Sequence, residues 1–145
     1  MWRLVTPDLR VDSVLDLDPA RLRSLGLDTL LLDVDCTLKR YSCEALAPGV
    51  ADWLDHLRAE KIGLCLVSNG RGPRIGRLAE TLRLPVVSQA CKPLPFGCRR
   101  AIERMGADPR RSAMVGDQLF TDIMAGRLAG LVCILVRPIH PEEEH

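Results

Sequence analysis

The chain has 145 residues, of which 47% are hydrophobic, 27% charged and 3% aromatic, and its 20 basic and 19 acidic residues give a net charge of +1. This length fits one domain with a buried core, and the balanced charge and scarce aromatic residues argue against a nucleic-acid-binding surface. No apolar run approaches the roughly 20 residues of a membrane-spanning helix, and the first residues lack the apolar segment of a secretory signal, so we expect a cytoplasmic protein.

The first part of the chain predicts an apolar arm, a short helix and a buried strand. Residues 2–17 carry apolar side chains that we expect to pack over the edge of a sheet, with a membrane contact as the alternative. A helix is predicted over residues 18–26, because this segment opens on Asp-Pro, a favoured N-cap and first helical residue, and closes on Gly. The apolar run over residues 29–33 then predicts a strand.

The rest of the chain alternates helices with strands. Apolar side chains at helical spacing predict helices over 48–61, 73–82, 96–105 and 118–128, and apolar runs predict strands over 62–67, 86–87, 113–115 and 131–136. Such alternation is typical of a parallel sheet covered by helices. We therefore predict a single α/β domain over residues 1–145, a Rossmann-like three-layer α/β/α sandwich with a central parallel sheet of five strands. Within it, residues 1–27 form the arm and short helix, and residues 138–145 form a polar tail.

The most informative stretch is the end of the first predicted strand, where Asp33 and Asp35 follow a buried run and Thr37 comes next in the same alternation. Side chains two residues apart in a strand face the same side, so both carboxylates can reach one target. Neighbouring carboxylates repel unless a cation or a shared proton offsets their charge, and Mg²⁺ prefers oxygen ligands. A carboxylate held at a metal can also attack phosphorus. Alone, this pattern is weak evidence, because acidic pairs are common in loops and a solvated acidic turn is the more frequent explanation.

Polar side chains also follow the later strands. They are Ser68, Asn69, Lys92, Asp117 and Asp122. Because the carboxyl ends of parallel strands share one edge of a sheet, we expect these side chains to meet Asp33 and Asp35 in one pocket. Carboxylates, a hydroxyl and an ammonium group together indicate phosphoryl transfer, because a phosphate dianion approaches carboxylates only when Mg²⁺ bridges them. Lys92 and Ser68 would hold the remaining phosphate oxygens.

Four motifs resemble those of the haloacid dehalogenase superfamily of aspartate-nucleophile phosphatases, in the family's order and over most of the chain. They are LLLDVDCTL (30–38), LCLVSNG (64–70), Cys91-Lys92-Pro93 and MVGDQLFTDI (114–123). The segment before the first motif and the short interval after it resemble subfamily IIIA, YqeG-type, which is similar to the phosphatases that convert phosphatidylglycerophosphate to phosphatidylglycerol. Two residues depart from the pattern, since Cys36 and Gly70 stand where the family usually has Asn.

The resemblance implies a role for each motif residue. Asp33 would be the nucleophile and a metal ligand, and Asp35 the general acid and base, with its backbone carbonyl on Mg²⁺ as well. Asp117 would complete the Mg²⁺ ligands, and Asp122 would act behind them through water or by holding Lys92. The remaining side chains would bind phosphate or orient its ligands: Thr37, Ser68, Asn69 and Lys92. The intervals between motifs are too short for a lid, so we expect a capless, open site.

These features predict a Mg²⁺-dependent phosphomonoester hydrolase with an aspartyl-phosphate intermediate, acting on phosphatidylglycerophosphate in phospholipid biosynthesis. The alternatives are a phosphatase of a soluble sugar phosphate or other small phosphomonoester, a phosphoaccepting receiver, and a catalytically idle metal-binding interaction module. Asp35 argues against a receiver, which gains nothing from an acid that hastens loss of its phosphoryl group. Basic residues near the first two motifs form either a solvated face or a surface attracted to anionic lipid at the inner face of the membrane: Lys39, Arg40, Arg71, Arg74 and Arg77.

Overall fold

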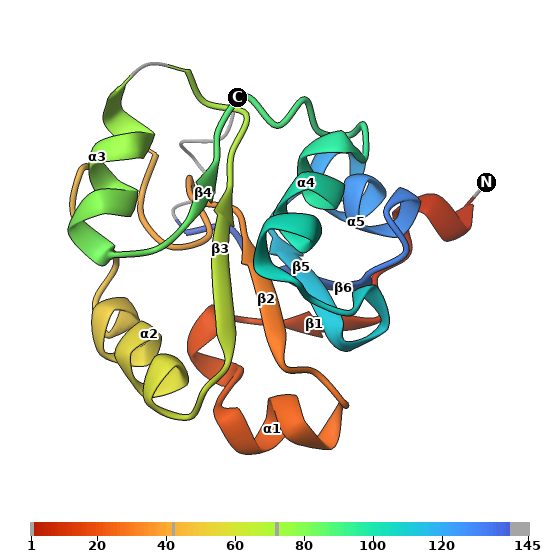
Figure 1. Cartoon of the computed structure of the whole chain (residues 1–145), viewed down its shortest axis with the longest axis horizontal. Helices are drawn as coiled ribbons and strands as arrows, with labels where there is room; N and C mark the ends of the chain where they lie inside the picture. Colours follow the sequence, from red (N-terminus) through yellow and green to blue (C-terminus); the bar gives the residue numbers. More distant parts are fainter. Residues whose placement is uncertain (1, 42, 72, 140–145) are drawn as a thin grey trace.

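A single parallel sheet organises the chain in the computed structural model, which describes residues 2–41, 43–71 and 73–139 (Figure 1). Its six strands lie in the order β1-β6-β5-β2-β3-β4, and every neighbouring pair is parallel. The strands are β1 (Leu9–Val11), β2 (Thr29–Leu32), β3 (Gly63–Val67), β4 (Val86–Val87), β5 (Ser112–Gly116) and β6 (Val132–Val136). Most of the predicted polar tail, residues 140–145, lies outside the described residues.

Helices cover both faces of this sheet, which confirms the predicted three-layer sandwich. They are α1 (Pro19–Ser24), α2 (Val50–Ala59), α3 (Pro73–Leu82), α4 (Phe96–Met105) and α5 (Met124–Leu128). Helices α1 to α3 pack against one face and α4 and α5 against the other, as Figure 1 shows for α2 and α4 on either side of β3. Among the described residues, no helix combines the length and the apolar character needed to cross a membrane.

The alternation of side chains along the strands divides the core in two. In β2, Leu30 and Leu32 belong to the cluster beneath α1 to α3, while Leu31 belongs to the cluster beneath α4 and α5. All three are fully buried. Because successive strand residues point to opposite faces, a strand covered on both sides must be apolar throughout. The central position of β2 therefore explains why the run before Asp33 has no polar residue apart from Thr29.

The predicted number of five strands is wrong, because residues 9–11 form a sixth strand at the edge of the sheet. We expected this segment to pack over the edge, but it pairs in parallel with β6. Leu9 and Val11 pack against the core, while Arg10 between them is exposed. Three residues are too few for the alternation to be recognised in the sequence.

The predicted continuous helix over residues 118–128 is also only partly correct. A π-helical turn, Leu119–Ile123, comes first, and α5 follows it. The N–H groups of Asp122 and Ile123 both donate to the carbonyl of Gln118, at 3.0 and 3.2 Å. Such widened turns are frequent at functional sites because they redirect a side chain. Here the turn directs Asp122 back toward the end of β5.

Helix α1 begins and ends as the sequence predicts. The N-cap Asp18 accepts a hydrogen bond from the N–H of Arg21 at 2.8 Å, and Gly26 has a φ of 74°. The first is the usual way to satisfy an unpaired N–H at a helix start, and the second is a backbone angle that glycine adopts without strain.

Trp53 of α2 fixes this helix to the segment that precedes α1. Its side chain is buried, and its Nε1 donates to the carbonyl of Leu17 at 2.8 Å. We expect Trp53→Phe to lower the free energy of unfolding by about 1–3 kcal/mol, because it leaves the carbonyl of the buried Leu17 without this donor. Urea unfolding measures the change, and Trp2→Phe, at a side chain that is 80% exposed, is the matched control. Equal stability of Trp53→Phe and the unchanged chain would contradict this account.

Candidate active site

The predicted site residues gather at the carboxyl edge of the sheet. A cavity of about 410 Å³ is lined there by Asp33, Asp35, Cys36, Tyr41, Ser68, Asn69, Gly70, Lys92, Asp117, Gln118, Thr121 and Asp122. The cavity lies where the strand order reverses, since the chain moves from β2 out to β4 and then returns to β5 on the other side of β2. Ligands of open α/β sheets bind at this switch point. Thr37 does not line the cavity but contacts two of the carboxylates that do.

The ammonium group of Lys92 lies at the centre of the site. It is buried, and its Nζ donates to Asp33 Oδ1 and Asp122 Oδ1, both at 2.7 Å, and to the carbonyl of Val67 at 3.0 Å. These bonds use the three donors that an ammonium group has. Burial would lower the pKa of Lys92, but the charges of Asp33 and Asp122 outweigh burial and raise it. Lys92 is therefore a fixed positive charge within the site.

Asp122 is held as firmly as Lys92. Its second oxygen, Oδ2, accepts from the N–H groups of Asp117 and Gln118 at 3.1 and 3.2 Å. Gly116 makes room for this carboxylate, since a Cβ atom there would lie 2.3 Å from Asp122 Oδ2. Burial and the charge of Asp33 raise the pKa of Asp122 to about 6, although Lys92 opposes the increase.

The hydroxyl of Thr37 lies between two other carboxylates. Its Oγ1 is 3.2 Å from Asp33 Oδ2 and 3.3 Å from Asp117 Oδ1. A hydroxyl has one proton, so it can donate to only one of these oxygens at a time. Both oxygens are therefore close to one uncharged hydroxyl, and a nearby cation would offset the charge of the two carboxylates.

The oxygen donors of this cluster fit a Mg²⁺ ion. Asp33, Asp117 and Asp122 each provide an oxygen within 4.8 Å of the others, and Mg²⁺ binds oxygen ligands. Both oxygens of Asp122 already accept bonds from Lys92 and the backbone, so Asp33 and Asp117 are the better ligands. The carboxylate of Asp35 is not part of this cluster, and the predicted role of its backbone carbonyl stays a prediction.

The side chain of Asp35 is paired with two cations. Arg74 Nη2 of α3 lies 3.2 Å from Asp35 Oδ2, and Lys39 Nζ lies 2.9 Å from Oδ1. Burial would raise the pKa of Asp35, but the hydrogen bonds from Arg74 and Lys39 outweigh it and lower the pKa. Sequence reasoning missed this pairing and placed both cations in an exposed rim. For Lys39 that expectation is wrong, because its side chain is buried and also bonds the carbonyls of Arg40 and Cys43.

Asn69 holds the backbone of Lys92, and Ser68 lines the cavity. The amide of Asn69 donates to the carbonyl of Lys92 at 3.0 Å and accepts from its N–H at 2.8 Å. Asn69 therefore positions the Lys92 backbone in this structure. Ser68 Oγ accepts from the N–H of Gly70 at 3.0 Å, which leaves the hydroxyl proton for another acceptor in the cavity.

The backbone and the neighbours of Cys36 and Gly70 show how the Asn that is usual at each position would fit. Cys36 has a φ of 66°, in the left-handed region where Asn is enriched, so the usual Asn would fit this backbone well. A Cβ atom at Gly70 would lie 3.1 Å from Ile75 Cγ1 and 3.2 Å from Ser68 Oγ. An Asn at position 70 would therefore require a small shift of Ile75 or Ser68.

Comparison with known proteins identifies similar chains. The sequence model of haloacid dehalogenase-like hydrolases matches residues 8–130. The "Probable phosphatase YqeG" of Bacillus subtilis is 28% identical over 92% of this chain and 77% of its own length. The chloroplastic phosphatidylglycerophosphate phosphatase 1 of Chlamydomonas reinhardtii is 27% identical, and the match covers 94% of this chain but only 54% of that protein.

A solved structure supports the fold. The cobalt-bound deoxy-D-mannose-octulosonate 8-phosphate phosphatase of Haemophilus influenzae superposes with a TM-score of 0.61 at 15% identity, over 77% of this chain and 69% of that one. At this identity the likeness shows a shared fold and nothing about substrate.

Lys92→Met tests the charge balance of the site without any substrate. Asp122 loses the cation that opposes its protonation, so its pKa should rise further above 6, while in the unfolded chain it stays near 3.8. The folded state then keeps a proton that the unfolded state releases, so stability should increase as the pH falls from neutral toward about 4. Urea unfolding at pH 7.5 and pH 5 measures this increase. Lys92→Met with Asp122→Asn is the control and should lose most of the increase; an equal increase in both variants would contradict the assignment to Asp122.

Proposed function

This chain belongs to the haloacid dehalogenase-like hydrolases, and we propose that it is a Mg²⁺-dependent phosphatase that releases phosphate from phosphatidylglycerophosphate by way of an aspartyl-phosphate on Asp33. The observation that carries this proposal is the buried ammonium of Lys92 between Asp33 and Asp122, with Asp117 alongside. One fixed cation among three carboxylates leaves a net negative site that fits a divalent cation, and the two cations together can accept a phosphate dianion.

The chain's own residues supply the steps of the reaction. Asp33 attacks phosphorus, so that a bond between its carboxylate oxygen and phosphorus forms while the bond to the leaving oxygen breaks. Asp35 gives a proton to that leaving oxygen. Water then attacks the phosphorus, Asp35 takes a proton from the water, and the bond to Asp33 breaks, which restores both residues and releases phosphate.

The remaining polar groups hold the phosphoryl oxygens and the metal. Mg²⁺, bound by Asp33 and Asp117, would supply positive charge to the transferring group. Lys92 fixes the orientation of Asp33, and the hydroxyl of Ser68 can donate to a phosphoryl oxygen in the cavity. Asn69 contributes indirectly, because it holds the backbone of Lys92.

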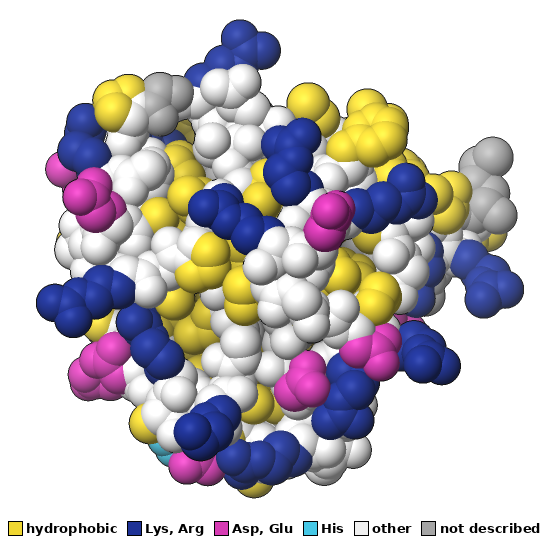
Figure 2. Space-filling model, viewed as in Figure 1, with side chains coloured by type: hydrophobic (Ala, Val, Ile, Leu, Met, Phe, Trp, Pro, Cys, Tyr) yellow, Lys and Arg dark blue, Asp and Glu magenta, His cyan; other side chains and the backbone are white. Residues whose placement is uncertain are grey.

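Exposed aromatic side chains around the site support a lipid substrate. Four of the five aromatic residues are 57–80% exposed: Trp2, Tyr41, Phe96 and Phe120. Tyr41, Phe96 and Phe120 follow β2, β4 and β5, so they lie at the carboxyl edge with the cavity. Figure 2 shows hydrophobic side chains beside Lys and Arg side chains on the upper part of the molecule. Aromatic residues are enriched where proteins meet the membrane interface.

Basic residues at the same edge fit an anionic membrane surface. Arg40 and Arg71 lie in the segments after β2 and β3 and are exposed. Each basic residue close to an anionic bilayer contributes about 1 kcal/mol to binding. The substrate named for the chloroplast relative, phosphatidylglycerophosphate, is an anionic lipid of such a surface. We therefore place the protein at the inner face of the membrane during catalysis.

Phosphate release from vesicles tests the proposal. We expect release from phosphatidylglycerophosphate in vesicles, loss of at least 1000-fold in rate in Asp33→Asn because the nucleophile is gone, and loss without Mg²⁺. Asp52→Asn, at an exposed position on α2, is the matched control and should keep full activity. Release from soluble phosphomonoesters alone would overturn the lipid substrate, and no release from either would overturn the phosphatase.

The aromatic residues give a second prediction. Phe96→Ser with Phe120→Ser should lower the affinity of the protein for anionic vesicles about tenfold, because about 1.4 kcal/mol of apolar burial at the interface is lost. Sedimentation of the protein with the vesicles measures this affinity. Leu25→Ser is the matched control, since Leu25 is 45% exposed but lies just before β2, at the opposite edge of the sheet. Equal loss in both variants would show that these phenylalanines have no special part in membrane contact.

A further inference from the structure

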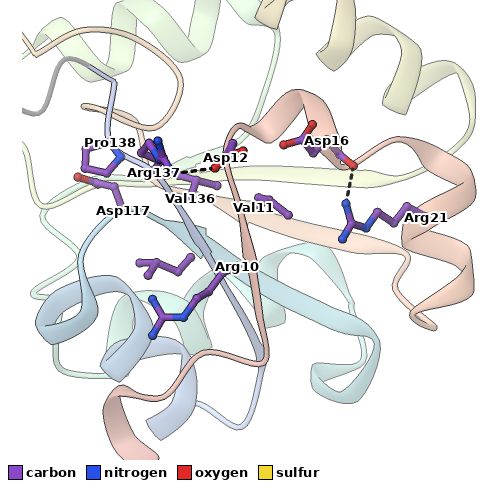
Figure 3. Close-up of a pocket in the computed structure, with 10 residues that line it drawn as sticks. Arg10, Val11, Asp12, Asp16, Arg21, Asp117, Val136, Arg137 and Pro138 are labelled. Atoms are coloured by element: carbon purple, nitrogen blue, oxygen red, sulfur yellow. Dashed lines mark hydrogen bonds and ion pairs between the residues drawn. The ribbon is translucent and has the colours of Figure 1, made fainter.

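A second cavity lies beside the first and shares Asp117 with it. It has a volume of about 470 Å³ and is lined mainly by residues of β1, β6 and the segments that follow them. Figure 3 shows its residues, with Arg10 and Asp117 toward one end of this groove and Asp16 and Arg21 toward the other. Of its lining residues, only Asp117 takes part in the proposed reaction.

The groove contains three arginines, and they differ in their partners. Arg137 forms an ion pair with Asp12 at 3.2 Å, and Arg21 contacts the carbonyl of Asp16 at 3.5 Å. Arg10, by contrast, forms no side-chain hydrogen bond or ion pair with another described residue. Its guanidinium therefore keeps all five of its donors for a ligand in the groove.

The strand register places Arg10 in line with the active site. Arg10 of β1 pairs with Leu135 of β6, and Leu135 pairs with Gly116 of β5, the residue before Asp117. Asp33 follows Leu32 of β2, whose partner in β5 is Val115, so Asp33 continues the same row. Three strand spacings separate the backbones of Arg10 and Asp33, about 14 Å in all. Figure 3 shows the Arg10 side chain in an extended form, reaching toward the side of the groove on which Asp117 lies.

We propose that Arg10 binds a second phosphate group of the substrate, so that this groove selects phosphomonoesters that carry one. The inference rests on the proposed function and adds to it the residue that recognises the rest of the head group. Phosphatidylglycerophosphate has such a group, a phosphodiester joined to the phosphomonoester through one glycerol unit. Arginine suits this task because its planar guanidinium donates two parallel hydrogen bonds to a phosphate.

The test compares two water-soluble substrates of the whole chain. Glycerophosphoglycerophosphate, the deacylated head group, has both a phosphodiester and a phosphomonoester, whereas glycerol 3-phosphate has only the monoester. We expect Arg10→Gln to lower the ratio of their kcat/KM values by about tenfold, through a higher KM for the first compound, and Arg10→Lys to restore part of it. Arg110→Gln is the control, because this side chain is 89% exposed and lies before β5, at the other edge of the sheet.

Fructose 1,6-bisphosphate as a third substrate separates the two sources of a second phosphate. If the unchanged chain prefers the diester compound and this preference depends on Arg10, the result supports a lipid head group. If it prefers the bisphosphate and this preference depends on Arg10, the result supports the subsite with a soluble substrate. An unchanged ratio in Arg10→Gln would overturn the subsite but leave the phosphatase intact. Equilibrium binding of glycerophosphoglycerophosphate to the same variants tests Arg10 independently of turnover: undiminished binding to Arg10→Gln would overturn the subsite, whereas weakened binding without phosphate release would overturn only the phosphatase.

Discussion

The buried ammonium group of Lys92 is the interaction on which the site depends. A buried cation is stable only with well-placed carboxylates around it, and Asp33 and Asp122 meet that need at 2.7 Å each. The carbonyl of Val67 and the side chain of Asn69 fix Lys92 from the end of β3. The segments after β2, β3, β4 and β5 are thus joined at one charged centre. The same contacts that satisfy Lys92 also hold Asp33 in one orientation, so stability and the placing of the proposed nucleophile have a common origin.

Much of this arrangement could be predicted from the sequence because parallel strands share an edge. Apolar runs located β2, β3 and β5 and the polar residues after them, and parallel pairing then brings those residues together whatever the details of the loops. Helix α1 could also be predicted from the sequence, since Asp18 and Gly26 have the chemistry that its two ends require. In each case a local pattern and the global fold favour the same structure, and such agreement makes sequence reasoning dependable.

Other features depend on contacts between parts of the chain that are far apart in the sequence, and the spacing of apolar residues does not reveal such contacts. Strand β1 has three residues, and the packing of Leu9 and Val11 that defines it exists only once β6 is in place. The π-helical turn has no sequence signal of its own. It accompanies the hydrogen bonds that Asp122 accepts from the two N–H groups after Gly116. Periodicity gives the face on which a residue lies. The burial of Lys39 and the bonds between Asn69 and Lys92 depend instead on the positions that individual side chains take once the fold has formed.

The pairing of Asp35 adds a constraint on the proposed reaction. An acid that gives a proton to the leaving group must first hold one, yet Arg74 and Lys39 favour the ionised form of Asp35 and lower its pKa. That form suits the second step, in which Asp35 takes a proton from water. The two cations differ, however, because Lys39 is buried whereas the side chain of Arg74 is 40% exposed and contacts Asp35, which lines the cavity. A phosphate dianion bound in the cavity would compete with Asp35 for Arg74, and each contact that it took from Asp35 would raise the pKa of that carboxylate. Substrate binding would therefore favour proton uptake by Asp35, and product release would restore its pairing with Arg74.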